Sequence, residues 1–220
     1  MKVVLFDLEG TLVRTKGPIT AEELGNQTKQ KLLELGIPNQ ILCRTSKATI
    51  MRNEASKYVE KYFGDNRRKL FNFELDRFMK NYEVAAAHNS MLFDETLHVL
   101  RELQNMGTVM GIVTNTSKEA LELIFSKHPI QEFFQVVITR EDMKMLKPSP
   151  EGIQLALRRL QRKGELFFFV GDYAFDVTAA TKAKGISILV CRKSSHRPTK
   201  SANYIVQSLS GIPSIIKNFT

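Results

Sequence analysis

The sequence predicts an α/β protein built on a doubly wound parallel sheet, with a small α-helical cap domain inserted after the first strand. Five short apolar runs suit strands that are covered on both faces, and from about residue 92 onward they alternate with helical patterns. About 100 residues separate the first run from the second, which is too many for one crossover connection. An insertion must therefore follow the first strand.

The predicted strands and helices of the sheet domain follow in order along the chain. The strands are Val3–Phe6, Val109–Val113, Val136–Ile138, Leu166–Val170 and Ile186–Val190. Leucine, isoleucine and alanine at helical spacing predict the helices Thr96–Met106, Ser117–Lys127, Pro150–Leu160 and Asp176–Lys184. A proline at the start of the third helix and a glycine after the fourth suit a helix start and a helix end. This alternation indicates right-handed crossovers in a single sheet.

The inserted segment carries helical patterns without strand alternation. Thr20 and Glu23 form a capping-box pattern ahead of a helix that runs to about Leu35. Further helices are predicted near Ser46–Phe63 and Leu70–Tyr82. Three apolar side chains at helical spacing are expected to build the core of the insert: Phe71, Leu75 and Phe78.

The insertion divides the chain into two expected domains. Residues 1–14 and 92–220 would form the α/β core domain, and residues 15–91 would form the helical cap domain. Linkers are predicted near Arg14–Pro18 and Ala86–Leu92. Candidate gates between the two domains are Lys16-Gly17-Pro18 in the first linker and the second linker as a whole.

Composition narrows the class of function. With 43% hydrophobic and 25% charged residues, the chain matches an ordinary globular protein and excludes a disordered or collagen-like one. Its net charge of +9 favours anionic partners, which include phosphorylated metabolites, nucleic acid and acidic surfaces. Nucleic acid is not expected as a partner, because no helix-turn-helix or RNA-reading motif is present. A basic run, Arg192, Lys193, Arg197 and Lys200, is interpreted as a solvated loop, with contact to a phosphate-rich partner as the alternative.

The sequence also bears on location. Cys43 and Cys191 have no metal-type spacing and do not suggest a secreted disulfide scaffold. No apolar run approaches the length of a membrane helix, and the first residues do not resemble a signal peptide. We therefore expect a cytoplasmic protein with no membrane partner, either a monomer or a homodimer.

Two carboxylates follow the first predicted strand, Asp7 and Glu9, ahead of a turn at Gly10. The carboxyl ends of parallel strands form the ligand crevice of an open α/β sheet, so both side chains are expected to face a substrate. Asp7 suits a nucleophile, and Glu9 suits an acid/base that moves the protons of leaving group and water. The alternative for Asp7 is a capping acid at the turn.

The segment from Asp7 to Thr11 resembles the Asp-x-Asp-Gly-Thr signature of the haloacid dehalogenase-like superfamily, with Glu9 in place of the second aspartate. Later segments resemble the remaining motifs of that family in the expected order: Thr114-Asn115 after a strand, Lys147-Pro-Ser-Pro150, Gly171-Asp172 with Asp176, and a closing strand and helix between Ala202 and Ile216. The layout is most similar to phosphoglycolate phosphatase-like enzymes, which carry a helical cap on a Rossmann-like core.

The resemblance implies an Mg²⁺-dependent phosphatase that hydrolyses a small phosphorylated metabolite through an aspartyl-phosphate. The implied catalytic residues are Asp7, Glu9, Thr114 and Lys147. The implied phosphoryl-binding residues are Gly10, Thr11, Thr114, Asn115 and Lys147. Because Mg²⁺ prefers oxygen ligands, Asp7, the backbone carbonyl of Glu9 and Asp172 would hold the ion, with Asp176 in a supporting role.

Several alternatives stay open at this point. Glu9 moves its carboxyl group outward by about 1.5 Å relative to aspartate, which is compatible with acid/base work or with a slow or purely binding protein on this fold. A phosphomutase or a haloacid dehalogenase is an alternative within the superfamily, although dehalogenases generally lack the Gly171-Asp172 pair. Thr114 could cap the next helix, and Asp176 could be an acid of a helix N-terminus. Three basic residues of the insert are options for reading the substrate: Arg44, Lys47 and Arg52.

Overall fold

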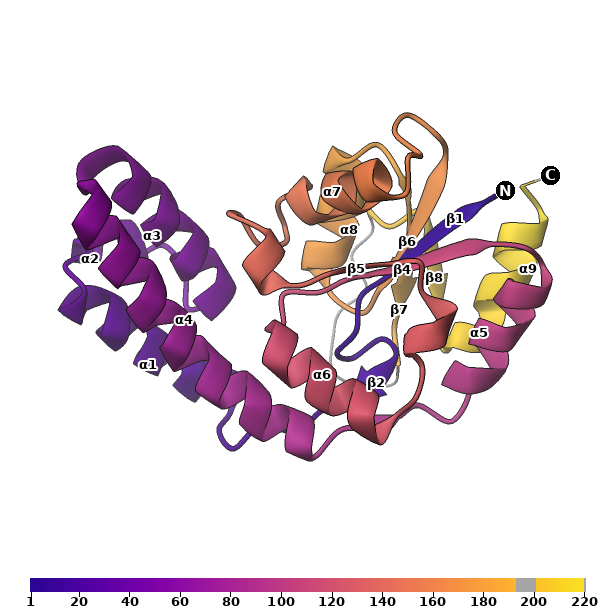
Figure 1. The fold of residues 1–220 in the computed structure, drawn as a ribbon, viewed down its shortest axis with the longest axis horizontal. Helices are drawn as coiled ribbons and strands as arrows, with labels where there is room; N and C mark the ends of the chain where they lie inside the picture. The colour runs from indigo at the N-terminus through magenta and orange to yellow at the C-terminus, as the bar shows by residue number, and fades with distance from the viewer. Residues whose placement is uncertain (193–200, 220) are drawn as a thin grey trace.

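The computed structural model describes residues 1–192 and 201–219, and a six-stranded parallel sheet forms its centre (Figure 1). The strand order is β5-β4-β1-β6-β7-β8. The strands are β1 (Val3–Phe6), β4 (Val109–Val113), β5 (Val136–Ile138), β6 (Phe167–Gly171), β7 (Ile186–Val190) and β8 (Tyr204–Val206). The predicted fold class is therefore confirmed, and β6 begins and ends one residue later than the sequence predicts.

The central position of β1 determines where a ligand can bind. Phe6, the last residue of β1, lies in register with Ile112 of β4 and Val170 of β6. The chain builds the sheet from β1 toward β5 and then crosses to the other side of β1 to begin β6. The crevice at such a switch of direction lies at the carboxyl ends of the strands, so the residues that follow β1, β4 and β6 meet there.

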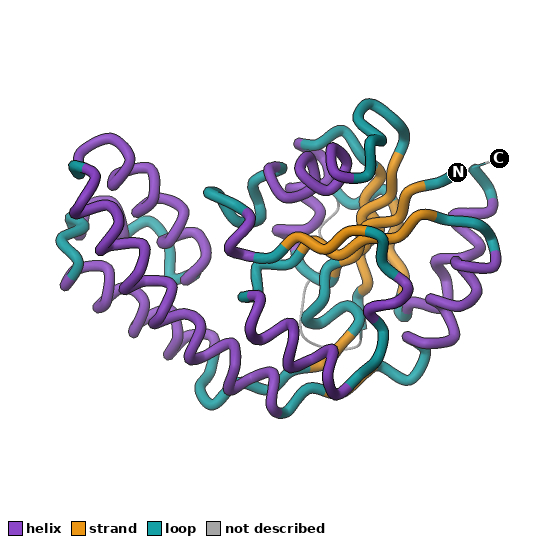
Figure 2. Tube along the Cα trace, viewed as in Figure 1, coloured by secondary structure: helices purple, strands orange, loops and turns teal. Residues whose placement is uncertain are grey.

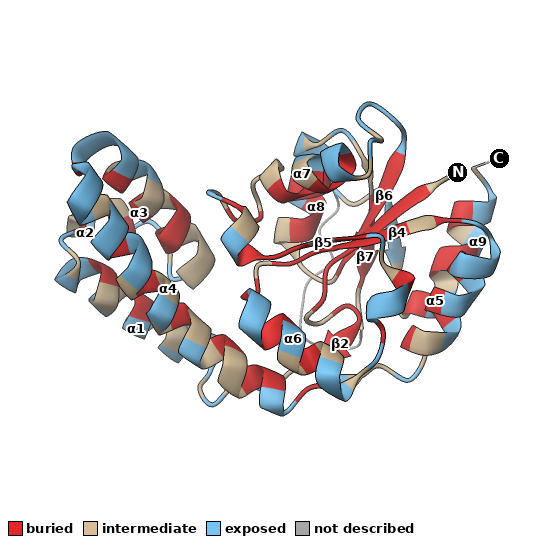
Figure 3. Ribbon diagram, viewed as in Figure 1, coloured by how far each residue is buried: buried red, intermediate tan, exposed pale blue. Residues whose placement is uncertain are grey.

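Helices cover both faces of the sheet. On one face, Phe6 and Phe168 belong to a buried cluster with α5 (Thr96–Asn105), α6 (Lys118–Lys127) and α9 (Ile212–Lys217). On the other face, Leu5 and Phe169 pack with α7 (Glu151–Arg159) and α8 (Ala174–Lys182). Short 3₁₀ turns occur at Gln131–Phe133, Arg140–Asp142 and Leu209–Gly211. Figure 3 shows the strands mostly buried and the outer sides of these helices exposed.

Four helices occupy the insertion: α1 (Ala21–Glu34), α2 (Asn39–Leu42), α3 (Ala48–Tyr62) and α4 (Asp65–His88). They enclose a hydrophobic cluster of their own, which contains the predicted residues Phe71 and Leu75, and the partly buried Phe78 packs against it. In Figure 2 these helices lie to one side of the sheet, and the long α4 runs back from them toward the core. The second half of α4 packs along α6.

The junctions of the insert differ from the prediction. The linker expected from Ala86 is wrong over Ala86–His88, because α4 continues to His88 through residues with good helix propensity, two of which are buried alanines. Two short strands, β2 (Val13–Arg14) and β3 (Met91–Leu92), pair antiparallel and hold the two chain crossings together. Neither they nor the four-residue α2 were predicted, since elements this short carry no periodic pattern. The division into two domains stays a prediction.

No helix within residues 1–192 and 201–219 is long and apolar enough to cross a membrane.

Of the basic run, Lys193, Arg197 and Lys200 lie outside the described residues. Arg192 is not a solvated loop residue. Its guanidinium donates to the backbone carbonyls of Gly10 and Thr11 and pairs with Glu95.

Candidate active site

A cavity of about 200 Å³ lies at the carboxyl ends of the central strands. Its walls come from the loops after β1, β4 and β6, from the loop before α7 and from the start of α8. The lining residues are Asp7, Glu9, Thr114, Asn115, Thr116, Lys147, Asp172, Tyr173, Phe175 and Asp176. Seven of these were predicted site residues, so segments far apart in the sequence converge as expected.

Asp7 directly extends β1 into the cavity. Its backbone N–H donates to Val170 O at 2.8 Å, which continues the sheet pairing one residue beyond the strand and fixes the backbone. The carboxylate accepts a hydrogen bond from the Lys147 ammonium at 2.5 Å and is 8% exposed. A rigid strand end thus presents a nearly buried carboxylate to the cavity.

Lys147 is held at both its side chain and its backbone. The ammonium donates to Asp7 at 2.5 Å and to Asp176 at 2.7 Å. The Asn115 side chain accepts from the backbone N–H of Lys147 at 2.9 Å and donates to its carbonyl at 3.3 Å. Asn115 was predicted to bind phosphoryl oxygens, and here its amide also clamps the lysine loop.

Three aspartates could hold a cation together. Oxygen atoms of Asp7, Asp172 and Asp176 all lie within 4.8 Å of one another. The Asp176 carboxylate also accepts from the backbone N–H of Tyr173 at 2.9 Å, at the start of α8. Asp176 therefore lies at the N-terminus of α8 and also beside the predicted ligands Asp7 and Asp172. The sequence had left these two roles as alternatives.

Gly10 is required by its backbone and by its neighbour. Its φ angle is +80°, a left-handed conformation that favours glycine. A Cβ built on Gly10 would lie 2.2 Å from the Asp172 carboxylate. The turn after β1 can therefore pack against Asp172 only because Gly10 has no side chain.

Glu9 points toward the loop after β4. Its carboxylate accepts a hydrogen bond from the Thr116 hydroxyl at 2.9 Å. The Thr116 backbone N–H donates to the Thr114 hydroxyl oxygen at 3.2 Å, and the two threonine hydroxyls lie 3.0 Å apart. Ser117, and not Thr114, caps α6, so the capping alternative for Thr114 is wrong.

The site holds more acidic than basic groups, and burial makes the ionised forms of the carboxylates unfavourable. Burial raises the pKa values of Asp7, Glu9 and Asp172 to about 7 each. Lys147 lowers those of Asp7 and Asp172, and a hydrogen bond from Thr116 lowers that of Glu9, without cancelling the effect of burial. Burial alone would lower the pKa of Lys147, but Asp176 and Asp7 outweigh it and hold the ammonium charged. An additional cation among the aspartates would favour their ionised forms.

Two predicted phosphoryl-binding residues do not line the cavity. Thr11 is fully buried, and its hydroxyl has no hydrogen-bond partner among the described residues. Gly10 instead lets the turn pack closely against Asp172, and its carbonyl accepts a hydrogen bond from Arg192. Arg192 and Glu95 thus brace the turn that carries Asp7 and Glu9, a role that the basic run did not reveal.

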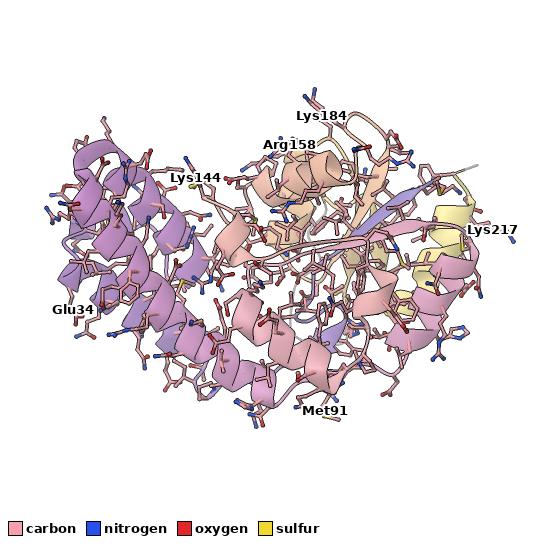
Figure 4. The ribbon with its side chains drawn as sticks, in the orientation of Figure 1. Glu34, Met91, Lys144, Arg158, Lys184 and Lys217 are labelled. Carbon is pink, nitrogen blue, oxygen red and sulfur yellow. The ribbon has the colours of Figure 1, made fainter. Side chains whose placement is uncertain are left out.

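The insert contacts the core beside the lysine loop. Asn53 of α3 donates to the carbonyl of Leu146 at 2.8 Å and accepts from its N–H at 3.0 Å. Arg52 donates to the carbonyl of Lys144 at 2.8 Å, and Figure 4 shows Lys144 on the loop that faces the inserted helices. Of the three predicted basic options, Arg52 therefore contacts the core backbone, and Lys47 lies 5.7 Å from the ring of Tyr173, which lines the cavity.

A second contact joins α4 to the loop after β5. The Arg140 guanidinium is 1% exposed and pairs with Asp76 and Glu83 of α4. Glu83 also accepts from the backbone N–H of Ser117 at 2.9 Å. Sequence reasoning missed Thr116, Asn53 and the pair of Arg140 with Glu83, because each acts through a partner remote in sequence.

Fold and site together define an α/β protein whose titratable groups gather after the central strands of a parallel sheet. The chain belongs to the haloacid dehalogenase-like hydrolase family, whose sequence model matches residues 4–190. Among curated relatives, the pyrophosphatase PpaX of Bacillus cereus (strain G9842) is 29% identical over 195 residues, which cover 85% of this chain and 83% of the relative. The PpaX of Bacillus thuringiensis (strain Al Hakam) is 28% identical over the same length.

Solved structures share the fold. A HAD phosphatase from Thermococcus onnurineus superimposes with a TM-score of 0.60 at 23% identity, covering 98% of each chain. An L-2-haloacid dehalogenase from Xanthobacter autotrophicus, with chloropropionic acid covalently bound, gives a TM-score of 0.61 at 16% identity and covers all of both chains. The same fold therefore occurs in proteins named as a phosphatase and as a dehalogenase, so the activity of this chain has to be argued from its site residues.

Proposed function

We propose that this hydrolase is a Mg²⁺-dependent phosphatase that acts on a small phosphorylated metabolite. One observation carries the proposal: Asp7 lies at a strand end, accepts a hydrogen bond from the Lys147 ammonium, and has a carboxylate oxygen within 4.8 Å of oxygens of two further aspartates. A phosphate ester and Asp7 are both negative, so their approach needs this lysine together with a cation held by the aspartates. The pyrophosphatase names of curated relatives support a phosphorylated substrate.

The residues present fit a divalent cation. Asp7, Asp172 and Asp176 offer oxygen ligands, the donor type that Mg²⁺ prefers, and a single lysine balances their charge incompletely. The backbone carbonyl of Glu9 is the further ligand that we propose. When bound, the ion would supply positive charge that keeps Asp7 ionised and offsets the charge of the phosphoryl oxygens.

In the first proposed step, an Asp7 carboxylate oxygen forms a bond to phosphorus while the bond from phosphorus to the leaving oxygen breaks. The Glu9 carboxyl group donates its proton to the leaving oxygen. Lys147, the Thr114 hydroxyl and the backbone N–H of Asn115 bind the phosphoryl oxygens as charge shifts onto them. The products of this step are the dephosphorylated alcohol and phosphorylated Asp7.

In the second step, water attacks the phosphorus atom of phosphorylated Asp7. The ionised Glu9 accepts a proton from this water, and the bond between phosphorus and the Asp7 oxygen breaks. The step releases inorganic phosphate and restores the Asp7 carboxylate and the protonated Glu9. A Glu9 pKa of about 7 suits a group that must alternate between the two protonation states.

We propose that residues 15–91 act as a cap domain over a core of residues 1–14 and 92–220. The antiparallel pairing of β2 with β3 supports a hinge at the two crossings. The contacts of Asn53 and Arg52 with the loop before Lys147 support closure over the cavity, which would exclude bulk water. A cavity of about 200 Å³ suits a small substrate.

The test is hydrolysis of p-nitrophenyl phosphate and inorganic pyrophosphate, with Mg²⁺ or with a chelator. We expect Mg²⁺-dependent turnover of at least one of them by the wild-type chain. Asp7→Asn should remove it, because an amide does not attack phosphorus. Equal, negligible turnover by both proteins in a wider panel of phosphorylated metabolites would favour a binding protein on this fold and contradict the proposal.

A further inference from the structure

We propose that Thr116 is a positioning residue that holds the Glu9 carboxyl group where it can transfer protons. This inference rests on the proposed function, since it concerns the acid/base of the same reaction. Thr116 hydrogen-bonds Glu9 at 2.9 Å, and its side chain lies in the wall of the cavity that contains Asp7. Acid/base transfer requires the carboxyl group to stay within hydrogen-bond reach of the proton it moves.

Glu9 needs such a partner more than an aspartate would. It has one more rotatable bond, so fixing its carboxyl group costs more side-chain entropy. Its carboxyl group also lies farther from the backbone by about 1.5 Å, one C–C bond. An aspartate at position 9 would therefore end too far from the Thr116 hydroxyl for a hydrogen bond. The hydroxyl matches the length of glutamate.

Thr116 itself is held firmly enough to do this. It is 3% exposed, its carbonyl accepts from the Arg140 N–H at 3.0 Å, and its own N–H donates to the Thr114 hydroxyl oxygen at 3.2 Å. The next residue, Ser117, is fixed by Glu83 through its backbone N–H. Backbone hydrogen bonds thus hold the loop after β4 in place, and the Thr116 side chain on this loop contacts Glu9.

The Thr116 hydroxyl is not needed to cap the helix that follows it, because Ser117 caps α6. Its hydroxyl makes two contacts in the described part of the chain, one with Glu9 and one with the Thr114 hydroxyl at 3.0 Å. The hydroxyl therefore links the predicted phosphoryl-binding threonine to the predicted acid/base.

Pre-steady-state hydrolysis of p-nitrophenyl phosphate separates positioning from general damage. p-Nitrophenolate leaves without needing a proton, so phosphorylation of Asp7 barely depends on Glu9, whereas the attack of water does. Thr116→Val should keep the rate of the first-turnover burst and lower the steady-state rate, by about tenfold to a hundredfold for a misplaced catalytic group. Thr116→Ser keeps the hydroxyl and should stay within about threefold of wild type, since only a methyl group is lost.

A matched control removes a buried hydroxyl elsewhere. Thr108 is 9% exposed and donates to the carbonyl of Leu103 at 2.8 Å, at the far end of β4 from the cavity. Thr108→Val should leave both the burst and the steady-state rate unchanged. The same Thr116→Val change in a Glu9→Asp background should have little further effect, because the shorter side chain does not reach residue 116.

Two results would overturn the proposal. One is a Thr116→Val variant with wild-type steady-state turnover. The other is an equal loss from Thr116→Val in the wild-type and the Glu9→Asp backgrounds, which would mean that Thr116 acts directly on the substrate. Failure of the proposed function gives a different result, because the wild-type chain itself would then show neither a burst nor Mg²⁺-dependent steady-state turnover.

Discussion

Lys147 serves two buried carboxylates at once, at 2.5 Å from Asp7 and 2.7 Å from Asp176. Its ammonium also lies 5.4 Å from the ring of Phe169, and because Lys147 is only 3% exposed, water is largely excluded around it. A charge in such a place stabilises the fold only while its partners remain. The ammonium that forms these ion pairs would also provide the positive charge for the phosphoryl group in the proposed reaction.

Replacing this lysine tests both roles. Lys147→Met should lower the free energy of unfolding by about 3–5 kcal/mol without divalent cation, because two buried carboxylates lose their counter-ion. It should also lower kcat by about 10²- to 10³-fold, the loss typical for one removed charge-stabilising donor. Urea unfolding and steady-state kinetics measure the two effects. A variant with wild-type kcat would contradict the role of Lys147 in phosphoryl binding.

Individual residues were predictable where a strand carries them. Asp7, Thr114 and Asp172 each follow an apolar run, and parallel strands bring their carboxyl ends together, so their convergence follows from the sequence. Thr116 was not predictable, because its role depends on the length of the Glu9 side chain and on a contact across 107 positions. The two threonine hydroxyls look equivalent in sequence, and only the fold distinguishes them.

The clearest link between elements is the one between α3 and the loop before Lys147. Asn53 makes two hydrogen bonds with the backbone of Leu146, and Asn115 makes two with the backbone of Lys147. One asparagine comes from the insert and the other from the sheet domain. Closure of the insert, as proposed, would therefore be linked to the placement of the lysine through the adjacent peptide groups of Leu146 and Lys147.

Asn53→Ala should weaken this link. The loss of two buried hydrogen bonds should lower the free energy of unfolding by about 1–3 kcal/mol. It should also lower kcat by about tenfold, since the lysine loop loses one of its supports. Asn66→Ala, in the exposed first turn of α4, is the control and should change neither. Wild-type kcat in Asn53→Ala would show that the insert does not act on the lysine loop.

Elements were predictable according to their length and pattern. The five predicted strands and the helices after residue 92 appear within a few residues of their expected bounds, because each carries a long enough run of apolar or helical spacing. The end of α4 was placed six residues too early, at Tyr82 and not at His88, since its last turns pack against α6 and no breaker marks where they stop. Tertiary contact, and not local propensity, sets that boundary.

At the scale of the whole molecule, charge is distributed unevenly. The chain carries +9 overall, yet the cavity at the centre of the sheet holds four carboxylates and one lysine. A basic surface attracts anionic substrates, and an acidic cavity would repel them at the last step. The divalent cation that we propose would resolve this conflict by offsetting the charge of the carboxylates.

The thermal stability of the chain should therefore depend on Mg²⁺. In chelator-treated protein, adding Mg²⁺ to about 100 times its Kd should stabilise the fold by about 2.7 kcal/mol, which raises Tm by about 5–10 °C for a chain of this size. Asp172→Asn removes one predicted ligand and should abolish most of the shift. An equal shift in both proteins would place the ion elsewhere.

The central claim is that Asp7 becomes phosphorylated and is then freed by water that Glu9 activates. The most direct measurement uses Glu9→Gln, mixed with Mg²⁺ and p-nitrophenyl phosphate, quenched in acid and mapped by mass spectrometry of its peptides. We expect one phosphate per chain, on Asp7, and none when Asp7→Asn is added to the variant. Phosphate on another residue, or turnover with no phosphorylated protein at any time, would contradict it.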